Sequence, residues 1–324
     1  MGEFDLIARY FTRPAARSAL GVGDDCALLQ PSPGTQLAVS SDMLVEGRHF
    51  FADVDPFTLG HKALAVNLSD LAACGATPLA FTLALALPRL DEAWLEAFSR
   101  GLWALADAHG CELVGGDTTR GPLNICITVF GEVPRGQALL RSGARAGDDI
   151  YVSGTLGDAR LALDALRGAL ALPADLLAQA RARLEQPTPR VALGQALRGV
   201  ATAAIDVSDG LLGDLRHILK ASGVGATLDT SITINLIAAC AHSSCATGLI
   251  SLKKQLECVL AGGDDYELVF TAPVSAREAV LCAARQAQTA VTRIGRIEAE
   301  PGLRLVNAQG NAVPNTYTSF DHFA

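Results

Sequence analysis

The chain has 324 residues, half of them hydrophobic, which is long for one compact core and predicts two domains. Lys and Arg together number 26 against 34 Asp and Glu, a formal net charge of −8. This acidic balance, with no run of basic residues, argues against nucleic acid or an anionic membrane as the main partner.

No targeting or membrane segment is expected. The N-terminus has an early acidic residue and no long apolar stretch, unlike a signal peptide. The most apolar stretch, residues 78–88, is shorter than the roughly 20 residues that cross a bilayer. The eight cysteines form no Cys-x-x-Cys pair, which predicts reduced core residues in a cytoplasmic protein. Cys240 and Cys245, in a polar loop, are the only pair considered for metal.

Hydrophobic periodicity predicts alternating helices and strands in residues 1–136. Helices are expected at 4–13, 56–74 and 91–109, and strands at 37–41, 79–87, 111–114 and 124–133. Asp91 suits the N-cap of the third helix, and Gly110 suits its end. The spacing of the second helix puts Asn67 and Asp70 on one flank.

A polar, Gly-rich stretch at 134–148 is a candidate junction, so the predicted domains are 1–136 and 137–324. Beyond it we expect strands at 149–153, 203–207, 266–271 and 290–297, and helices after 154–157 and at 174–185, 189–198, 209–221 and 275–288. Ser208 can N-cap the helix at 209–221. The predicted class is therefore α/β (α+β), with an α/β domain in each half.

Aspartates beside Gly or Ser stand at breaks in this apolar pattern. They are Asp24-Asp25, Ser40-Ser41-Asp42, Asp70, Gly116-Asp117 and Asp206-Val-Ser208-Asp209. Two carboxylates ~4 Å apart repel by about 4 kcal/mol at an effective dielectric near 20, so several converge only where cations neutralise them. Magnesium prefers oxygen ligands and often shares them with phosphates. The pattern predicts a site for a metal-bound polyphosphate.

Each aspartate taken alone also has a simpler explanation, because Asp is a common turn former and helix cap. That explanation fits less well for Asp70, in mid-helix, and for Asp206, inside an apolar run, since a buried unpaired carboxylate is costly. The sequence has no Walker loop, Gly-x-Gly-x-x-Gly after a strand, Gly-x-Ser-x-Gly or His-Glu-x-x-His. Its histidines lack zinc spacing, and only His49, just beyond Asp42, is kept as a site candidate.

Five motifs in order carry a resemblance to a known family. They are Gly-Val-Gly-Asp-Asp-Cys, Val-Ser-Ser-Asp-Met-Leu-Val-Glu-Gly-Arg-His-Phe, Lys-Ala-Leu-Ala-Val-Asn-Leu-Ser-Asp-Leu-Ala-Ala, Gly-Gly-Asp-Thr-Thr-Arg-Gly-Pro and Ile-Asp-Val-Ser-Asp-Gly-Leu. With them the chain resembles the thiamine-monophosphate kinases, nearly end to end. The wider superfamily includes aminoimidazole ribonucleotide synthetase and selenophosphate synthetase.

The resemblance implies ATP-dependent phosphorylation of thiamine monophosphate to thiamine diphosphate, with several Mg²⁺ ions. It also implies ATP in a cleft between two α/β domains, and a homodimer formed through the N-terminal sheet. The implied metal ligands are Asp25, Ser40, Ser41, Asp42, Asp70, Asp117, Asp206 and Asp209. The implied ATP contacts are Gly116, Asp117, Arg141 and Ser208, and the implied substrate contacts are His49, Asp264 and Tyr317.

Two stretches depart from the family pattern. Position 264 is usually Glu in this family and is Asp here, one methylene shorter. Residues 231–258 do not follow the family pattern, so we assign them no role. The acceptor phosphate is already anionic near neutral pH, so no protein general base is named. The alternatives are another ATP-using synthetase of the superfamily, a two-metal phosphohydrolase and a non-catalytic Mg-nucleotide-binding module.

Overall fold

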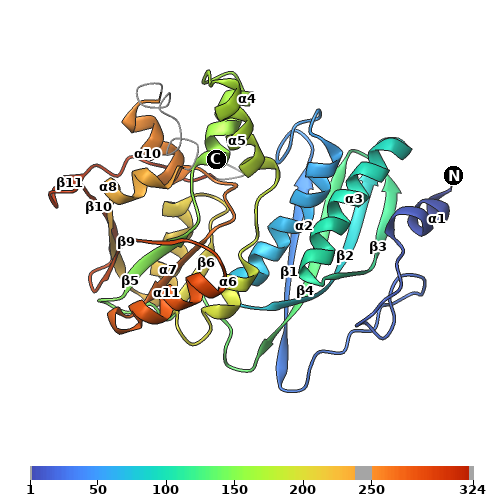
Figure 1. The fold of residues 1–324 in the computed structure, drawn as a ribbon, viewed down its shortest axis with the longest axis horizontal. Coiled ribbons are helices and arrows are strands. Elements are labelled where there is room, and N and C mark those ends of the chain that lie inside the picture. Colours follow the sequence, from blue (N-terminus) through green and yellow to red (C-terminus); the bar gives the residue numbers. More distant parts are fainter. Residues whose placement is uncertain (1, 238–249, 321–324) are drawn as a thin grey trace. The chain divides into compact units, whose positions relative to one another are not determined.

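The structure is a computed structural model that describes residues 2–237 and 250–320 (Figure 1). The chain folds into two compact units, residues 1–71 with 76–136, and residues 72–75 with 137–324. Both contain a sheet and helices, so the predicted two-domain α/β class is confirmed. Cys240 and Cys245 lie outside the described residues.

The first unit is a four-stranded sheet with the order β1-β4-β2-β3. Its elements are α1 (Glu3–Leu6), the π-helix η1 (Ile7–Phe11), β1 (Thr35–Val45), α2 (Pro56–Ala73), β2 (Thr77–Leu87), α3 (Glu92–His109), β3 (Glu112–Arg120) and β4 (Asn124–Pro134). Strand β4 pairs antiparallel with both β1 and β2, whereas β2 and β3 are parallel. Helices α2 and α3 lie over one face of this sheet (Figure 1).

Helix α3 begins and ends where the sequence predicts. The Asp91 side chain accepts a hydrogen bond from the Trp94 N–H at 3.1 Å, and Gly110 ends the helix in the left-handed conformation. Helices α2 and α3 touch through glycines, because a Cβ atom on Gly60 or Gly101 would overlap a backbone carbonyl of the other helix. This close approach leaves the apolar faces of both helices free to cover the sheet.

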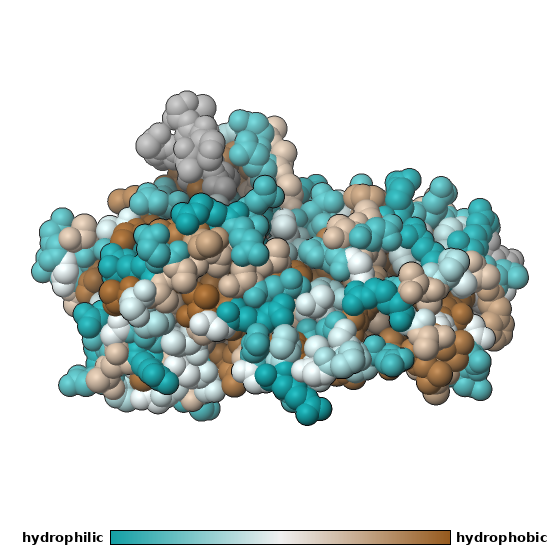
Figure 2. Space-filling view, turned by 60° about the horizontal axis from the view of Figure 1, so that its bottom comes forward, coloured by the Kyte–Doolittle hydropathy of each residue, from teal (hydrophilic) through white to brown (hydrophobic). Residues whose placement is uncertain are grey.

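The two faces of the four-stranded sheet differ in exposure. On the helix-covered face, Ile127 and Val129 of β4 are fully buried. On the other face, alternate residues of β1 are open, and Leu37, Val39 and Met43 are 46%, 57% and 52% exposed. Figure 2 shows brown apolar patches among hydrophilic residues on one face of the molecule.

The second unit is a seven-stranded mixed sheet with the order β11-β10-β7-β9-β5-β8-β6. Its strands are β5 (Asp149–Ser153), β6 (Ala203–Asp206), β7 (Gly225–Asp229), β8 (Leu268–Ala272), β9 (Val291–Glu298), β10 (Gly302–Val306) and β11 (Ala312–Val313). Its helices are α4 (Asp158–Leu166), α5 (Ala174–Glu185), α6 (Val191–Ala196), α7 (Leu211–Ser222), α8 (Thr230–Thr233), η2 (Ile234–Leu236), α10 (Leu252–Ala261), η3 (Val274–Ala276) and α11 (Arg277–Gln286). Side chains of α4, α5, α7 and α10 share one core with the sheet.

Several predictions of local structure need correction. Strand β1 continues through Asp42, and β3 through Asp117, so these residues lie within strands rather than in turns after them. Helix α7 has Gly210 at its N-cap, with no side-chain cap, so the prediction for Ser208 is wrong. Cys26 and Cys282 are exposed and are not core residues.

Strands β7 and β10 and helix α10 were not predicted from the sequence. Helix α10 begins within residues 231–258, to which no role is assigned, and extends to Ala261. Across the described ranges, the structure contains no helix with both the length and the apolar character to cross a bilayer.

Candidate functional site

Strand β1 and helix α2 bring four oxygen-bearing side chains together in the first unit. The Ser40 hydroxyl donates a hydrogen bond to the Asp70 carboxylate. The Asp42 N–H donates to Asn67 Oδ1 at 3.1 Å. The Asn67 amide nitrogen donates to the Ala63 carbonyl one turn earlier, which fixes the direction of Oδ1. The predicted flank of Asn67 and Asp70 therefore faces β1.

Ser41 lies on the other face of β1, as the alternation along a strand requires. Its hydroxyl is 3.0 Å from Thr128 Oγ1 and donates to the Ile127 carbonyl at 3.1 Å. The structure therefore separates the Ser41 side chain from Ser40 and Asp42.

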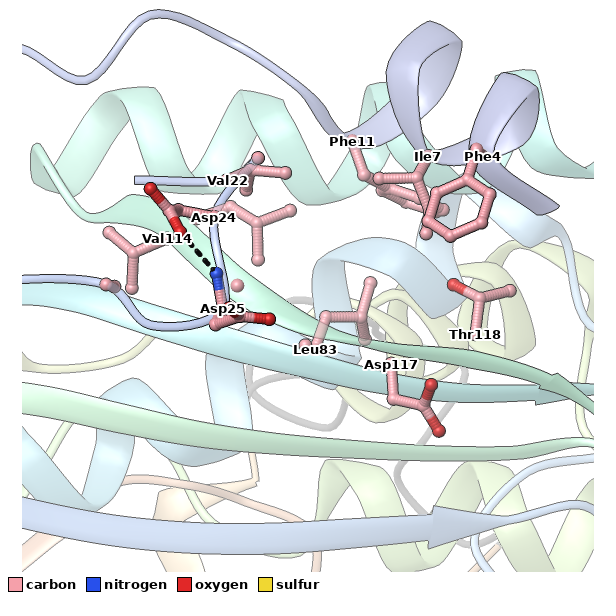
Figure 3. Close-up of a pocket in the computed structure, with 15 residues that line it drawn as sticks. Phe4, Ile7, Phe11, Val22, Asp24, Asp25, Leu83, Val114, Asp117 and Thr118 are labelled. Carbon is pink, nitrogen blue, oxygen red and sulfur yellow. Dashed lines mark hydrogen bonds between the residues drawn. The ribbon is translucent and has the colours of Figure 1, made fainter. Parts of the chain in front are cut away.

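A second group of predicted residues lines a cavity of about 570 Å³ in the first unit (Figure 3). Asp24 and Asp25 come from the loop before β1, and Gly116 and Asp117 come from β3. Apolar side chains form the rest of the wall, among them Phe4, Ile7, Phe11, Leu83 and Val114. The Asp25 N–H donates to Asp24 Oδ1 at 2.9 Å, the dashed line in Figure 3. The cavity has the size and the apolar lining, with a few polar groups, of a small-molecule site.

Asp42 and Asp117 do not come together within one sheet. Asp42 lies in a row with Ile127, Leu83 and Gly116, on the helix-covered face. Asp117 lies in the next row, with Ala84, Cys126 and Met43, on the open face. Three strand spacings of ~4.8 Å separate β1 from β3, or about 14 Å.

The Asp42 and Asp117 side chains therefore project from opposite faces of this sheet. Consistent with this, no group of three His, Cys, Asp or Glu side chains is arranged to hold a metal ion among residues 2–237 and 250–320.

His49 lies in the tight turn after β1. Its Nδ1 accepts a hydrogen bond from the Val45 N–H at 2.9 Å, so the neutral ring carries its proton on Nε2. This bond fixes the ring against the end of β1, three residues beyond Asp42.

In the second unit, two acidic motifs lie side by side. Asp206 is buried at the end of β6, and the loop after it carries Ser208 and Asp209. The Asp264 N–H donates to the Ser208 carbonyl, and the Tyr266 N–H to the Val207 carbonyl, both at 2.8 Å. The structure therefore brings Asp206, Ser208, Asp209 and Asp264 into one region of the second unit.

Asp214 organises this region, although the sequence did not point to it. One oxygen of its buried carboxylate accepts the N–H groups of Ser208, Asp209 and Gly210, each at 3.1 Å. Burial, and next the charge of Asp209, raise the pKa of Asp214 to about 7, although the three N–H groups act in the opposite direction. In the sequence, only the position of Asp214 in the first turn of α7, close to the acidic motif, could have indicated this role.

The segment that holds Asp264 is strained. Asp264 and Tyr266 have φ values of 65° and 52°, in the left-handed region that residues other than Gly seldom adopt. Between them Asp265 is buried, and both of its carboxylate oxygens accept the Gly157 N–H, at 3.0 and 2.9 Å. Strain of this kind concentrates at functional sites and persists only where surrounding contacts impose it.

The last described residues contact the same region. Tyr317 packs against the core of the second unit, and the Phe320 N–H donates to the Asp209 carbonyl at 3.1 Å. Residues 321–324, which follow, lie outside the described residues.

Arg141 is exposed. It lies beside β6, since the carbonyl of the preceding residue, Leu140, accepts the Ala204 N–H at 2.9 Å.

Comparison with known proteins first defines the class. Residues 23–133 match the family model of the AIR synthase related protein N-terminal domain. Residues 145–307 match that of the C-terminal domain. The chain is therefore a two-domain protein of the AIR synthase related class.

More similar relatives define the family within this class. The chain is 47% identical to thiamine-monophosphate kinase of Salmonella typhimurium, over 100% of this chain and 98% of the relative. It is also similar to the crystal structure of thiamine-monophosphate kinase from Stenotrophomonas maltophilia, with 47% identity, a TM-score of 0.83 and 96% of each chain covered. AaThiL in complex with AMPPCP and TMP has 29% identity and a TM-score of 0.75, covering 91% of this chain and 89% of AaThiL. The chain belongs to the thiamine-monophosphate kinase family, a family of enzymes.

Proposed function

We propose that this chain transfers the γ-phosphoryl group of ATP to thiamine monophosphate and forms thiamine diphosphate. The observation that carries the proposal is the 47% identity to a thiamine-monophosphate kinase over the full length of the chain. AaThiL, which has the same fold, was solved with AMPPCP and TMP, an ATP analogue and the proposed substrate.

The oxygen-rich side chains suit magnesium. Mg²⁺ is usually held by one or two carboxylates together with substrate phosphates, so a cage of three carboxylates is not required. Asp42 and Asp70, with Ser40 and the Asn67 carbonyl beside them, supply hard oxygen donors on one side of β1. Asp206 and Asp209 supply further carboxylates in the second unit. We propose that these residues, with Asp25, Ser41 and Asp117, hold the metal ions.

For the transfer itself, the protein mainly has to place the acceptor phosphate in line with the γ-phosphoryl group of ATP. A terminal oxygen of thiamine monophosphate attacks the γ-phosphorus in line, the bond from this phosphorus to the β–γ bridging oxygen breaks, and ADP leaves. The attacking oxygen is already anionic near neutral pH because the second phosphate pKa is about 6. Bound Mg²⁺ would neutralise the charge that keeps the two phosphates apart. Arg141 would add a guanidinium for the ATP phosphates, with Gly116 and Ser208 as further nucleotide contacts. His49, Asp264 and Tyr317 would bind the thiamine monophosphate.

We also propose a homodimer formed through the first unit. Leu37, Val39 and Met43 form an exposed apolar stripe along β1, an edge strand. Such stripes at an unpaired edge are usually covered by another chain. Asp117 projects from the same open face, so a second copy on this face would lie next to it.

ADP release under substrate screening tests the function. The expected result is ADP formation that requires both thiamine monophosphate and Mg²⁺, with thiamine diphosphate as the second product. ADP formation with a ribonucleotide amide or selenide instead would support a synthetase. Phosphate release from thiamine monophosphate without ATP would support a phosphohydrolase.

Substitution of the proposed metal ligands tests the mechanism. Asp42→Asn and Asp206→Asn should each lower turnover strongly when Mg²⁺ is limiting, because one anionic ligand is lost. Near-normal turnover of either variant at limiting Mg²⁺ would contradict the assignment of that residue.

A further inference from the structure

The loop that carries Asp24 and Asp25 is attached to the sheet at both of its ends. Residues 19–31 have little regular structure, apart from a short pairing in which the Ala19 N–H donates to the Leu28 carbonyl and the Leu28 N–H to the Leu20 carbonyl, both at 3.0 Å. Residues 22–25 and 27 of this loop line the cavity beside Gly116 and Asp117 (Figure 3). We call residues 16–32 the acidic loop.

Glu112, the first residue of β3, holds the beginning of the acidic loop. Its carboxylate accepts the N–H groups of Ala16, Arg17 and Ser18 at 2.7, 2.8 and 3.0 Å, and the Ser18 hydroxyl at 2.8 Å. Burial raises the pKa of Glu112, but the bonds from Ser18, Ala16 and Arg17 outweigh it, so the pKa lies below its ordinary value. The carboxylate is therefore ionised at neutral pH and binds four donors.

Glu132, on β4, holds the end of the loop in the same way. Its carboxylate accepts the Ser32 N–H at 2.7 Å, the Ser32 hydroxyl at 3.0 Å and the Thr35 hydroxyl at 3.3 Å. Its pKa is also lowered, because bonds from Ser32 and Thr35 and the charge of Arg17 outweigh the effect of burial.

Arg17 connects the two attachment points. Its N–H bonds to Glu112, and its guanidinium lies 3.9 Å from Glu132 Oε1. The same guanidinium donates to the carbonyls of Pro78 and Gly110 at 3.3 and 3.4 Å. Glu112 and Glu132 pair with Ala80 and Thr77 of β2, so both ends of the loop are fixed at the same end of the sheet.

We propose that Glu112 and Glu132 are positioning residues that hold Asp24 and Asp25 in the wall of the cavity, and that this cavity receives the metal-bound nucleotide. A loop with fixed ends has less conformational freedom to lose when it orders around a ligand. The inference rests on the proposed function, because it assigns Asp25 a role with Mg²⁺ and ATP. Neither glutamate contacts the ligand in this proposal.

An exposed cysteine in the acidic loop makes the inference testable without turnover. Cys26 follows Asp25 directly and is exposed, and Cys282 on α11 is an exposed internal reference. Alkylation of each cysteine is measured by peptide mass spectrometry, with and without Mg²⁺ and AMPPCP. Binding of Mg²⁺–AMPPCP is measured in parallel by calorimetry. In the wild-type chain, the ligand should slow alkylation of Cys26 and leave that of Cys282 unchanged.

Glu112→Ala and Glu132→Ala should each weaken Mg²⁺–AMPPCP binding about tenfold, the lower end of the effect of outer-shell partners on metal affinity. At saturating ligand they should also reduce the protection of Cys26. Glu112→Gln keeps one acceptor oxygen and should give a smaller effect than Glu112→Ala. Asp91→Ala, which removes the N-cap of α3 in the same unit, is the stability control and should change neither readout.

The outcomes separate the inference from the proposed function. If the alanine variants bind the nucleotide and protect Cys26 as the wild type does, the inference is overturned and the proposed function stands. If Asp91→Ala has the same effect as the glutamate variants, the contacts serve stability alone and the inference is again overturned. If the wild type gives no binding heat with Mg²⁺–AMPPCP, the proposed function fails, and the inference fails with it.

Discussion

Glu267 should be one of the most sensitive positions for stability in the second unit. It directly precedes β8, its side chain is fully buried, and its carboxylate accepts the Ser153 hydroxyl at 2.6 Å. Arg183 on α5 contacts Oε1 at 2.7 Å, and Arg190, just before α6, contacts the two carboxylate oxygens at 2.5 and 2.6 Å. Glu267→Gln keeps the size of the side chain and removes the charge that two guanidinium groups share.

The magnitude follows from the burial of the partners. Breaking a buried ion pair from one side costs about 3–5 kcal/mol, because the remaining charge is left without compensation. Arg183 and Arg190 keep 20% and 18% of their side-chain exposure, so water can compensate in part and the lower value applies. For a unit of this size each kcal/mol lowers the Tm by roughly 2–4 °C, so about 3 kcal/mol corresponds to a fall of about 6–12 °C.

Thermal unfolding followed by circular dichroism measures this effect. Glu300→Gln is the matched control, because Glu300 forms an i,i+4 pair with Arg304 at the surface of the same unit, with side chains 91% and 44% exposed. Such a pair contributes only about 0.3–0.5 kcal/mol, so this variant should melt within ~2 °C of the wild type. The reasoning about buried charge is refuted if the two variants lose the same Tm.

Three further predictions concern the first unit. Gly116→Ala should destabilise it by about 1–3 kcal/mol in urea unfolding, because the added Cβ would overlap the Leu83 carbonyl at a φ of 148°; wild-type stability would contradict this contact. The pKa values of Glu112 and Glu132 are lowered in the folded chain, so their contribution to the free energy of unfolding should be complete above the ordinary pKa of about 4.3. This contribution should be lost as the pH falls through the lower folded values. Tm measured against pH should show this loss, and Glu112→Gln should flatten the curve; an unchanged curve would argue against it. Val39→Glu should convert the proposed dimer to monomer in sedimentation, whereas an unchanged mass would exclude this stripe as the contact.

Local structure was predictable at α3 and α2, where neighbouring residues decide it, but not at the start of α7, where Ser208 is not the N-cap. Asp91 and Gly110 mark the ends of α3 because capping bonds join residues three or four positions apart. The same short range put Asn67 and Asp70 on one flank of α2, and both face β1. The two acidic motifs of the second unit could be found by their composition. Their adjacency required the pairing of residues 207–208 with 264–266.

The roles of Asp214, Glu112 and Glu132 could not be predicted, because each depends on partners that the sequence pattern does not identify. Glu112 and Glu132 bind residues about a hundred positions away. A glutamate at a strand end looks like any surface carboxylate until the segment that lies over it is known.

The sequence alone determined which residues are chemically suited to the site, because residue type and local spacing do not depend on the fold. The tertiary structure decided which of them face each other. Strand β3 contains one extra residue, Val114, opposite the step from Phe81 to Thr82. A one-residue shift moves every later side chain to the other face of a sheet, so this bulge places Asp117 on the face opposite Asp42.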